Sequence, residues 1–244
     1  KSEILRKTGG ALKANGYEVR VFDLLNPDAS FCYNPLAYVR DDKDVLRLIE
    51  TLIQSTTPPG AQSSDPFWQK SETALLQAII LMLFQEAPEY EQNFSMVMRV
   101  LEYAEVREED EGHVSPLDLL FESIERRKPD SVAVRQYKVF KLAAGKTAKS
   151  ILVSTAVRLA PFNLPQIQAL TDHDDMNLYT LGEKQVALYA VIPDNDNTFN
   201  FLVSLLYAQA FQALYYSADQ IHHGPLPRHV HFILDEAPSV NLPG

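Results

Sequence analysis

Apolar and polar residues follow two different periods along this chain, and the changes of period predict where helices and strands lie. Apolar residues in 2–15 recur with helical spacing, and Gly16 is typical of a left-handed helix end. Residues 17–22 alternate as a strand does, 185–193 form an apolar run typical of a buried strand, and 230–234 form a shorter run. The pattern therefore predicts one helix and three strands near the two ends of the chain.

A strongly apolar helix is predicted over 198–217, between the second and third strands. Strand, helix and strand in that order are typical of a βαβ unit, whose strands pair in parallel. We therefore expect an α/β fold with a parallel sheet built from the two ends of the chain.

The middle of the chain, residues 41–141, has helical period and no competing strand pattern. Ser115-Pro116-Leu117-Asp118 resembles a capping box that begins a helix. The helices predicted in this block are 42–54, 66–84, 94–106 and 115–127. We expect an all-α domain at 41–141, inserted into an α/β domain composed of 1–40 and 142–244.

Residues 131–159 are predicted to form one long or broken helix that stops at Pro161. On a continuous helix, at about 100° per residue, four basic residues fall within roughly an 80° sector. They are Arg135, Lys138, Lys146 and Lys149. A basic stripe on an acidic protein is either a solvated helix face or a surface that follows the DNA backbone.

Charge is uneven along the chain. The net charge is −10 and the isoelectric point is about 5.1, so the surface as a whole is not suited to polyanions. Residues 41–141 carry 19 Asp or Glu against 11 Lys or Arg, which is −8 of the −10. Such a surface repels phosphates, so it indicates either contact with a basic protein cargo or solubility alone.

Length and composition narrow the class of protein. The chain has 244 residues, of which 46% are apolar, enough for one large domain or a domain with an insertion. The single Cys32 excludes a disulfide framework and fits a reducing compartment. The longest apolar run, 74–84, is shorter than the roughly 20 residues of a membrane span, and we expect no signal peptide. The chain lacks an initiating Met, and we expect it to be a piece of a longer protein.

The third predicted strand ends in two carboxylates, Asp235 and Glu236. Parallel sheets bind ligands at the carboxyl ends of their strands, and an apolar strand that ends in Asp-Glu has the form of a Walker B strand. There the Asp helps to hold a hydrated Mg²⁺ on a nucleotide, and the Glu orients the attacking water. The chain contains no P-loop, because Gly145 and the Lys-Thr after it lack the glycine five positions earlier, where Phe140 stands.

Histidines near the C-terminal end offer a weaker alternative. Four of them make a zinc site possible: His222, His223, His229 and His231. The Gly-Pro after the first two is typical of a turn, which argues against that site. The remaining two, His113 and His173, lie in charged loops that indicate no site.

Six short motifs complete the sequence evidence. They are Lys1-Ser2-Glu3-Ile4, Tyr33-Asn34-Pro35-Leu36, Ser64-Asp65-Pro66-Phe67-Trp68, the segment 140–150, Leu181-Gly182-Glu183-Lys184 and Phe232-Ile233-Leu234-Asp235-Glu236. In this order and over the whole chain, they resemble the conjugative type IV secretion coupling proteins, with the closest likeness to those of Gram-positive mobile elements.

The resemblance implies a membrane-anchored, RecA-like, hexameric ATPase at the cytoplasmic face of the membrane, with an all-α domain inserted in its nucleotide-binding domain. It implies ATP and Mg²⁺ as cofactors, with Asp235 on the metal, Glu236 as the catalytic residue, and Lys1 and Ser2 beside the phosphates. Family members receive a relaxase–DNA complex and pass it to the components of the secretion channel. Because the family's P-loop lies upstream of Lys1, we expect this chain alone to bind no nucleotide and to hydrolyse no ATP.

Two other functions stay open. The chain fits a non-catalytic helical adaptor that binds protein cargo, with the α/β part as scaffold only. It also fits another RecA-like translocase, such as an FtsK-type motor. An upstream P-loop preceded by two apolar spans would favour the motor over the adaptor, and a neighbouring relaxase gene would favour coupling.

Overall fold

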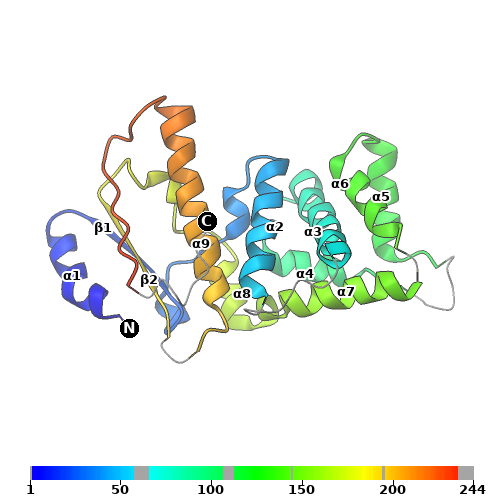
Figure 1. The fold of residues 1–244 in the computed structure, drawn as a ribbon, viewed down its shortest axis with the longest axis horizontal. Helices are drawn as coiled ribbons and strands as arrows, with labels where there is room; N and C mark the ends of the chain where they lie inside the picture. Colours follow the sequence, from blue (N-terminus) through cyan, green and yellow to red (C-terminus); the bar gives the residue numbers. More distant parts are fainter. Residues whose placement is uncertain (1, 58–65, 107–112, 144, 194–195, 236–244) are drawn as a thin grey trace. The chain divides into compact units, whose positions relative to one another are not determined.

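The chain folds into two compact units, each described here by itself. The computed structural model describes residues 2–57, 66–106, 113–143, 145–193 and 196–235 (Figure 1). The α/β unit comprises Lys1–Tyr38 with Ala169–Gly244, and the helical unit comprises Val39–Gln168. Within the described residues, no helix is both long and apolar enough to cross a membrane.

A small parallel sheet organises the α/β unit. Strand β1 (Glu18–Asp23) pairs with β2 (Val186–Val191) in a register that sets Glu18 opposite Val186 and Asp23 opposite Val191. Helix α1 (Glu3–Ala14) packs against both strands, and Figure 1 shows α9 (Asn200–Tyr216) on the other side of the sheet. The two ends of the chain therefore form a parallel sheet, as expected, although it has only two strands in the described residues, which are otherwise mostly helical.

The predicted strand over 230–234 is wrong, because residues 229–234 are extended without forming a strand. Among the described residues, one backbone hydrogen bond ties this segment to the neighbourhood of the sheet, from the Arg228 N–H to the Gly182 carbonyl at 2.9 Å. A strand needs a ladder of such bonds to an adjacent edge. No such ladder joins 229–234 to another part of the described chain, so the apolar pattern alone did not produce a strand.

Arg20 fixes the segment that leads into β2. Its side chain is buried, although it lies on β1. The guanidinium donates to the Met176 carbonyl at 2.5 Å, the Asn177 carbonyl at 3.1 Å and the Thr180 hydroxyl at 2.8 Å. Because a buried charge is tolerated only when its donors are satisfied, these bonds hold residues 176–180 in place below β1.

The Tyr33-Asn34-Pro35-Leu36 motif joins the sheet to α9. The Tyr33 hydroxyl donates to Gln209 Oε1 at 2.5 Å, and Gln209 Nε2 donates to the Pro35 carbonyl at 2.8 Å. The Asn34 side chain accepts from the Leu36 N–H at 3.0 Å and so supports the 3₁₀ turn Pro35–Tyr38. A motif noticed in the sequence is therefore a buried structural link.

Every described element of the helical unit is a helix. Its main helices are α2 (Asp42–Thr56), α3 (Pro66–Glu86), α4 (Phe94–Glu102), α5 (Pro116–Arg127), α6 (Val132–Lys141) and α7 (Gly145–Leu159). Helix α3 is the centre, because it packs against α2, α4, α6 and α7. The capping box is confirmed at the start of α5, where Ser115 and Asp118 each accept from the other's backbone N–H.

The helical unit continues to Gln168, past residue 141 where the sequence analysis ended the inserted domain. The reason is that α7 packs against α3 and α4 within this unit. A short helix, α8 (Pro165–Thr171), then leads back to the α/β unit and was not predicted. The segment 131–159 is broken, since α6 ends at Lys141 and α7 begins at Gly145.

Candidate functional site

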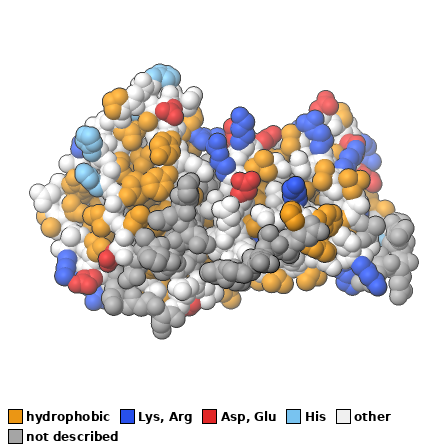
Figure 2. Space-filling model, in the orientation of Figure 1, with side chains coloured by type: hydrophobic (Ala, Val, Ile, Leu, Met, Phe, Trp, Pro, Cys, Tyr) orange, Lys and Arg blue, Asp and Glu red, His pale blue; other side chains and the backbone are white. Residues whose placement is uncertain are grey.

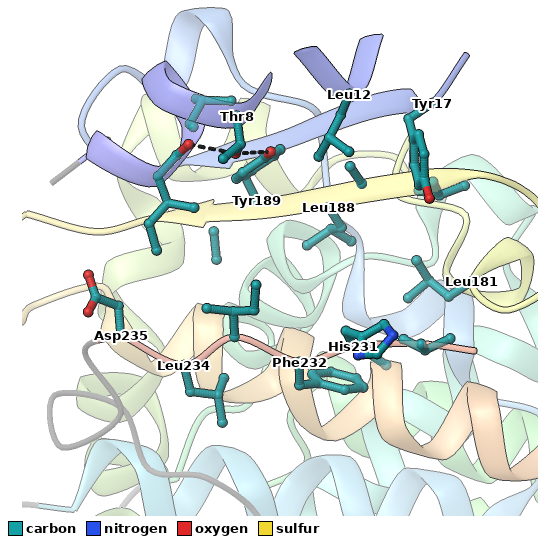
Figure 3. Close-up of a pocket in the computed structure, with 18 of the residues that line it drawn as sticks. Thr8, Leu12, Tyr17, Leu181, Leu188, Tyr189, His231, Phe232, Leu234 and Asp235 are labelled. Atoms are coloured by element: carbon teal, nitrogen blue, oxygen red, sulfur yellow. Dashed lines mark hydrogen bonds between the residues drawn. The ribbon is translucent and has the colours of Figure 1, made fainter. Parts of the chain in front are cut away.

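A large pocket lies in the α/β unit, beside the edge of β2 that does not face β1. Its volume is about 980 Å³, and α1, β2, α9 and the segment 227–235 line it (Figure 3). The pocket is lined by both of the described residues that the sequence analysis placed near a nucleotide, Ser2 and Asp235.

One wall of the pocket is an unpaired strand edge. The Gln185 carbonyl accepts from the Glu18 N–H of β1, and the Val191 carbonyl accepts from the Leu24 N–H just after β1. These two bonds establish which residues of β2 direct their backbone groups toward β1 and which direct them away from it. Residues 187 and 189 therefore also face β1, and the backbone groups of Leu188 and Ala190 face the pocket. Within the described residues, these outward groups of Leu188 and Ala190 have no backbone partner. This edge can accept another parallel strand.

The opposite wall is the extended segment after Arg228. Phe232 stacks on Phe211 of α9 with ring centroids 4.3 Å apart, which holds the segment against the helix. The next two side chains are not covered in the same way, since Ile233 is 74% exposed and Leu234 is 36% exposed. Figure 2 shows hydrophobic side chains exposed on this face of the α/β unit. Apolar residues exposed opposite an unpaired edge indicate an incomplete sheet.

A hydrogen bond between side chains joins helix α1 to strand β2 inside the pocket. The Thr8 hydroxyl lies 2.7 Å from the Tyr189 hydroxyl and also donates to the Ile4 carbonyl at 2.7 Å. Tyr207 of α9 lines the same pocket, and burial raises the pKa of its hydroxyl. The Tyr207 phenol therefore stays neutral at neutral pH and does not act as a base.

Gly182 shapes the start of the pocket. Its φ is +81°, and a Cβ at this position would lie 3.0 Å from Leu226 Cδ1. Because only glycine adopts this backbone conformation without strain and leaves room for Leu226, its carbonyl can reach the Arg228 N–H. The segment that leads into β2 and the segment after Arg228 are therefore joined at Gly182, and the pocket opens between them beyond this residue.

Asp235 lies at the other end of the pocket, where β2 ends (Figure 3). Ser2, directly before α1, lines the same pocket. Lys1 and Glu236, the other two residues assigned to nucleotide chemistry, lie outside the described residues. The structure thus brings Asp235 and Ser2 to one pocket at the carboxyl end of a parallel strand, which is where such folds bind ligands.

The basic stripe does not have the geometry that the sequence analysis assumed. Arg135 and Lys138 belong to α6, whereas Lys146 and Lys149 belong to α7, so the sector of one continuous helix does not apply. Lys138 forms an ion pair with Glu125 of α5. A DNA contact by these four residues stays a prediction, but it no longer rests on their alignment along one helix.

The four C-terminal histidines do not gather into a metal-binding group within the described part of the chain. His222 Nε2 lies 2.6 Å from Glu183 Oε1, and a His223 ring nitrogen lies 2.9 Å from the Asp219 carbonyl. His229 and His231 line the pocket instead. The interpretation of the first two as turn residues is consistent with the positive φ of His223.

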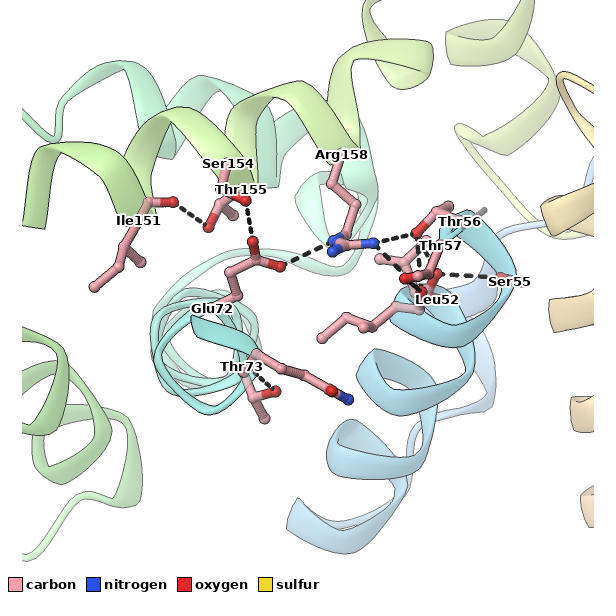
Figure 4. Close-up of polar contacts among 12 residues, drawn as sticks. Leu52, Ser55, Thr56, Thr57, Glu72, Thr73, Ile151, Ser154, Thr155 and Arg158 are labelled. Atoms are coloured by element: carbon pink, nitrogen blue, oxygen red, sulfur yellow. Dashed lines mark hydrogen bonds and ion pairs between the residues drawn. The ribbon is translucent and has the colours of Figure 1, made fainter. Parts of the chain in front are cut away.

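The sequence analysis missed a buried polar cluster in the helical unit (Figure 4). Glu72 of α3 accepts from Arg158 Nε of α7 at 2.9 Å and from the Ser154 hydroxyl. Arg158 also donates to Thr56 Oγ1 at 2.6 Å and to the Ile53 carbonyl at 3.3 Å, at the end of α2. The available signal was that Glu72 is the only acid in the predicted helix 66–84.

Comparison with known proteins gives one family. A family model described as "Type IV secretory system Conjugative DNA transfer" matches residues 1–241 of the 244. No curated protein matches the chain. The match covers both units and all the described residues that line the pocket.

Proposed function

We propose, from the premise that this chain belongs to the type IV secretory system conjugative DNA transfer family, that it is part of an ATP-driven coupling protein. In this proposal the α/β unit is a partial RecA-like nucleotide-binding domain, and the helical unit is the all-α domain inserted in it. The parent protein is a membrane-anchored hexamer that receives a relaxase–DNA complex and passes it to the secretion channel. The supporting observation is the position of Asp235 in the pocket, where β2 ends.

In this proposal a magnesium nucleotide would bind at one end of the pocket. A carboxylate at the carboxyl end of a parallel strand is a suitable ligand for hydrated Mg²⁺, so Asp235 would hold the metal of the nucleotide. Bound Mg²⁺ supplies charge neutralisation on the transferred phosphoryl group. Glu236, next in the chain, would orient the attacking water. Lys1 and Ser2 would approach the phosphates at the start of α1.

The phosphate-binding loop of this proposal is not in the 244 residues. The unpaired edge at Leu188 and Ala190 supports a further strand that pairs with β2 and carries that loop. Such a strand would lie between β2 and 229–234, cover the exposed Ile233 and Leu234, and give both of its neighbours hydrogen-bond partners. This arrangement explains why the predicted third strand lacks a ladder in this chain.

Cargo recognition is assigned to the helical unit. Most of the net negative charge belongs to residues 41–141, which favours a protein cargo with basic patches over bare DNA. DNA contact in the parent assembly would then fall to basic residues such as Arg135 and Lys146. Reversing the charge of both, and measuring the salt dependence of DNA binding, tests this assignment. An unchanged slope removes it.

The central test uses the protein that carries this chain together with a P-loop. Asp235→Asn and Glu236→Gln should each lower DNA-stimulated ATP hydrolysis by about 100-fold or more, because each removes a group acting on the phosphoryl transfer. Asp219→Asn, an exposed acid of the same unit, is the control and should retain the wild-type rate. ATP hydrolysis that survives Asp235→Asn would overturn the proposal. Relaxase binding without any ATP hydrolysis would favour the adaptor.

A further inference from the structure

Three potential metal ligands of different chemistry meet in the α/β unit, away from the pocket. Cys32 lies after β1, and His173 and Asp175 lie after α8. One ligand atom of each residue, the thiol sulfur, an imidazole nitrogen and a carboxylate oxygen, lies within 4.8 Å of the others. The cysteine and histidine are separated by 140 residues in the sequence, so the fold alone brings them together.

The backbone holds the two segments together at this point. The Asp175 N–H donates to the Cys32 carbonyl at 2.9 Å, and the Tyr33 N–H donates to the Leu170 carbonyl at 2.8 Å. The Cys32 N–H also reaches Asp175 Oδ2 at 3.3 Å. The Cys32 thiol also donates to the Ala169 carbonyl at 3.3 Å, so an ion that binds the sulfur as thiolate would take the place of this contact. Preorganised ligands lose less conformational entropy when an ion binds.

The spacing of two of the three ligand atoms, the imidazole nitrogen and the carboxylate oxygen, fits a tetrahedral ion. Bonds of about 2.0–2.1 Å from Zn²⁺ to nitrogen and oxygen separate the two ligands by about 3.4 Å. His173 Nε2 and Asp175 Oδ2 are 3.4 Å apart. The imidazole is therefore already placed for a shared ion, although the two groups also attract each other directly.

The orientation of His173 gives an independent sign. Its other ring nitrogen, Nδ1, faces Asp172 Oδ2 at 3.9 Å. Histidines that bind metals commonly present their second nitrogen to a carboxylate, which selects the tautomer and orients the ring. Here Nε2 lies on the side of Asp175 and Nδ1 on the side of Asp172, but 3.9 Å is longer than a hydrogen bond, so the carboxylate is near the second nitrogen without yet binding it.

We propose that Cys32, His173 and Asp175 form a Zn²⁺ site with a fourth position for water. A thiolate and an imidazole select a borderline-soft ion such as Zn²⁺ over Mg²⁺ or Ca²⁺, which prefer oxygen ligands alone. The site lies six residues before Tyr38 and four after Ala169, which are the two points where the chain leaves and re-enters the α/β unit. The ion clips these two segments together, and the inference is independent of the nucleotide chemistry proposed above.

The test uses the 244-residue chain, reduced and freed of metal. Calorimetric titration with Zn²⁺ should show one equivalent bound, and saturation should raise the melting temperature by about 5–10 °C at 100 times Kd. Co²⁺ should give the visible bands of a tetrahedral ion together with a near-ultraviolet thiolate-to-metal band. The Co²⁺ spectrum needs no variant, so it does not depend on how substitutions affect folding.

Variants identify the ligands. Cys32→Ser should remove the near-ultraviolet band, and Cys32→Ser, His173→Gln and Asp175→Asn should each weaken Zn²⁺ binding by about 10-fold or more. His229→Gln, an exposed histidine of the same unit, is the matched control and should bind as the wild type does. Zn²⁺ affinity unchanged by Cys32→Ser, an octahedral Co²⁺ spectrum, or no bound equivalent would each overturn the proposal. None of these results depends on ATP.

Discussion

Arg158 and Glu72 form a buried ion pair between α7 and α3, with Nε 2.9 Å from Oε2. The Glu72 side chain is only 3% exposed, and the same guanidinium closes the end of α2 through Thr56 and Ile53. One side chain thus connects three helices. It also supplies positive charge to helix carbonyls that otherwise lack intrahelical partners.

Removing Arg158 should destabilise the helical unit more than most surface substitutions do. Arg158→Ala leaves a carboxylate buried without its partner, so we expect a loss of about 3 kcal/mol in the free energy of unfolding, measured by urea denaturation. The double variant Glu72→Gln/Arg158→Ala should recover part of this loss, because it removes the unpaired charge. A loss below about 1 kcal/mol for Arg158→Ala would contradict the structural role.

The start of α5 should respond to acid. Burial opposes ionisation of Asp118, but hydrogen bonds from Ser115, Lys141 and Tyr137 prevail and hold the pKa of this carboxyl below its ordinary value. A lowered folded-state pKa means that the stabilisation is complete above the unfolded-state value of about 3.9 and is lost as the pH falls through the folded-state value.

Asp118→Asn should therefore lower stability at pH 7, and the difference from the wild type should shrink as the pH falls below about 4. Unfolding curves between pH 2.5 and pH 7 measure this difference, with the exposed Asp130→Asn as the control. A difference that is constant across this range would show that the charge of Asp118 does not contribute.

The unpaired edge of β2 makes a prediction that needs no substitution. In the 244-residue chain, the amides of Leu188 and Ala190 should exchange with solvent faster than those of Tyr189 and Val191, whose N–H groups face β1. In a protein that includes the partner strand, all four should be protected. Residue-resolved hydrogen exchange distinguishes the two patterns, and equal protection in the 244-residue chain would exclude a free edge.

The helical unit should account for cargo binding. In the parent protein, replacing Val39–Gln168 with a short linker should abolish binding of the cognate relaxase and spare basal ATP hydrolysis. Tyr33 and Leu170 are already joined by a backbone hydrogen bond, so the two cut ends lie on segments that pair with each other. Relaxase binding that persists without the helical unit would assign recognition elsewhere.

Local signals in the sequence predicted local structure well. The capping box of Ser115 and Asp118, the end of α1 before Gly16 and the apolar strand β2 all depend on residues within a few positions of one another. The sequence pattern also predicted a parallel sheet, from the strand, helix and strand of 185–193, 198–217 and 230–234, but the observed parallel pair is β1 with β2.

The errors have a non-local origin. Residues 230–234 have the composition of a strand, but a strand forms only beside an edge that no pattern within 230–234 reveals. The sequence left open whether 131–159 is one helix or a broken one, and the basic stripe assumed one helix, whereas α6 ends at Lys141 and α7 begins at Gly145. Cys32 and His173 come together only through the pairing of two distant segments, so no spacing rule would have joined them.

Gly182 has a consequence for variation at this site. Because its carbonyl holds Arg228 and its missing side chain admits Leu226, this one position sets how far apart the two walls begin. A larger residue there would push residues 226–228 outward and change the gap along its whole length, several residues away from any carboxylate. The width of the gap between β2 and 229–234 is thus set by Gly182, at the end of the pocket opposite Asp235. The same residue therefore decides whether another strand can fit into that gap.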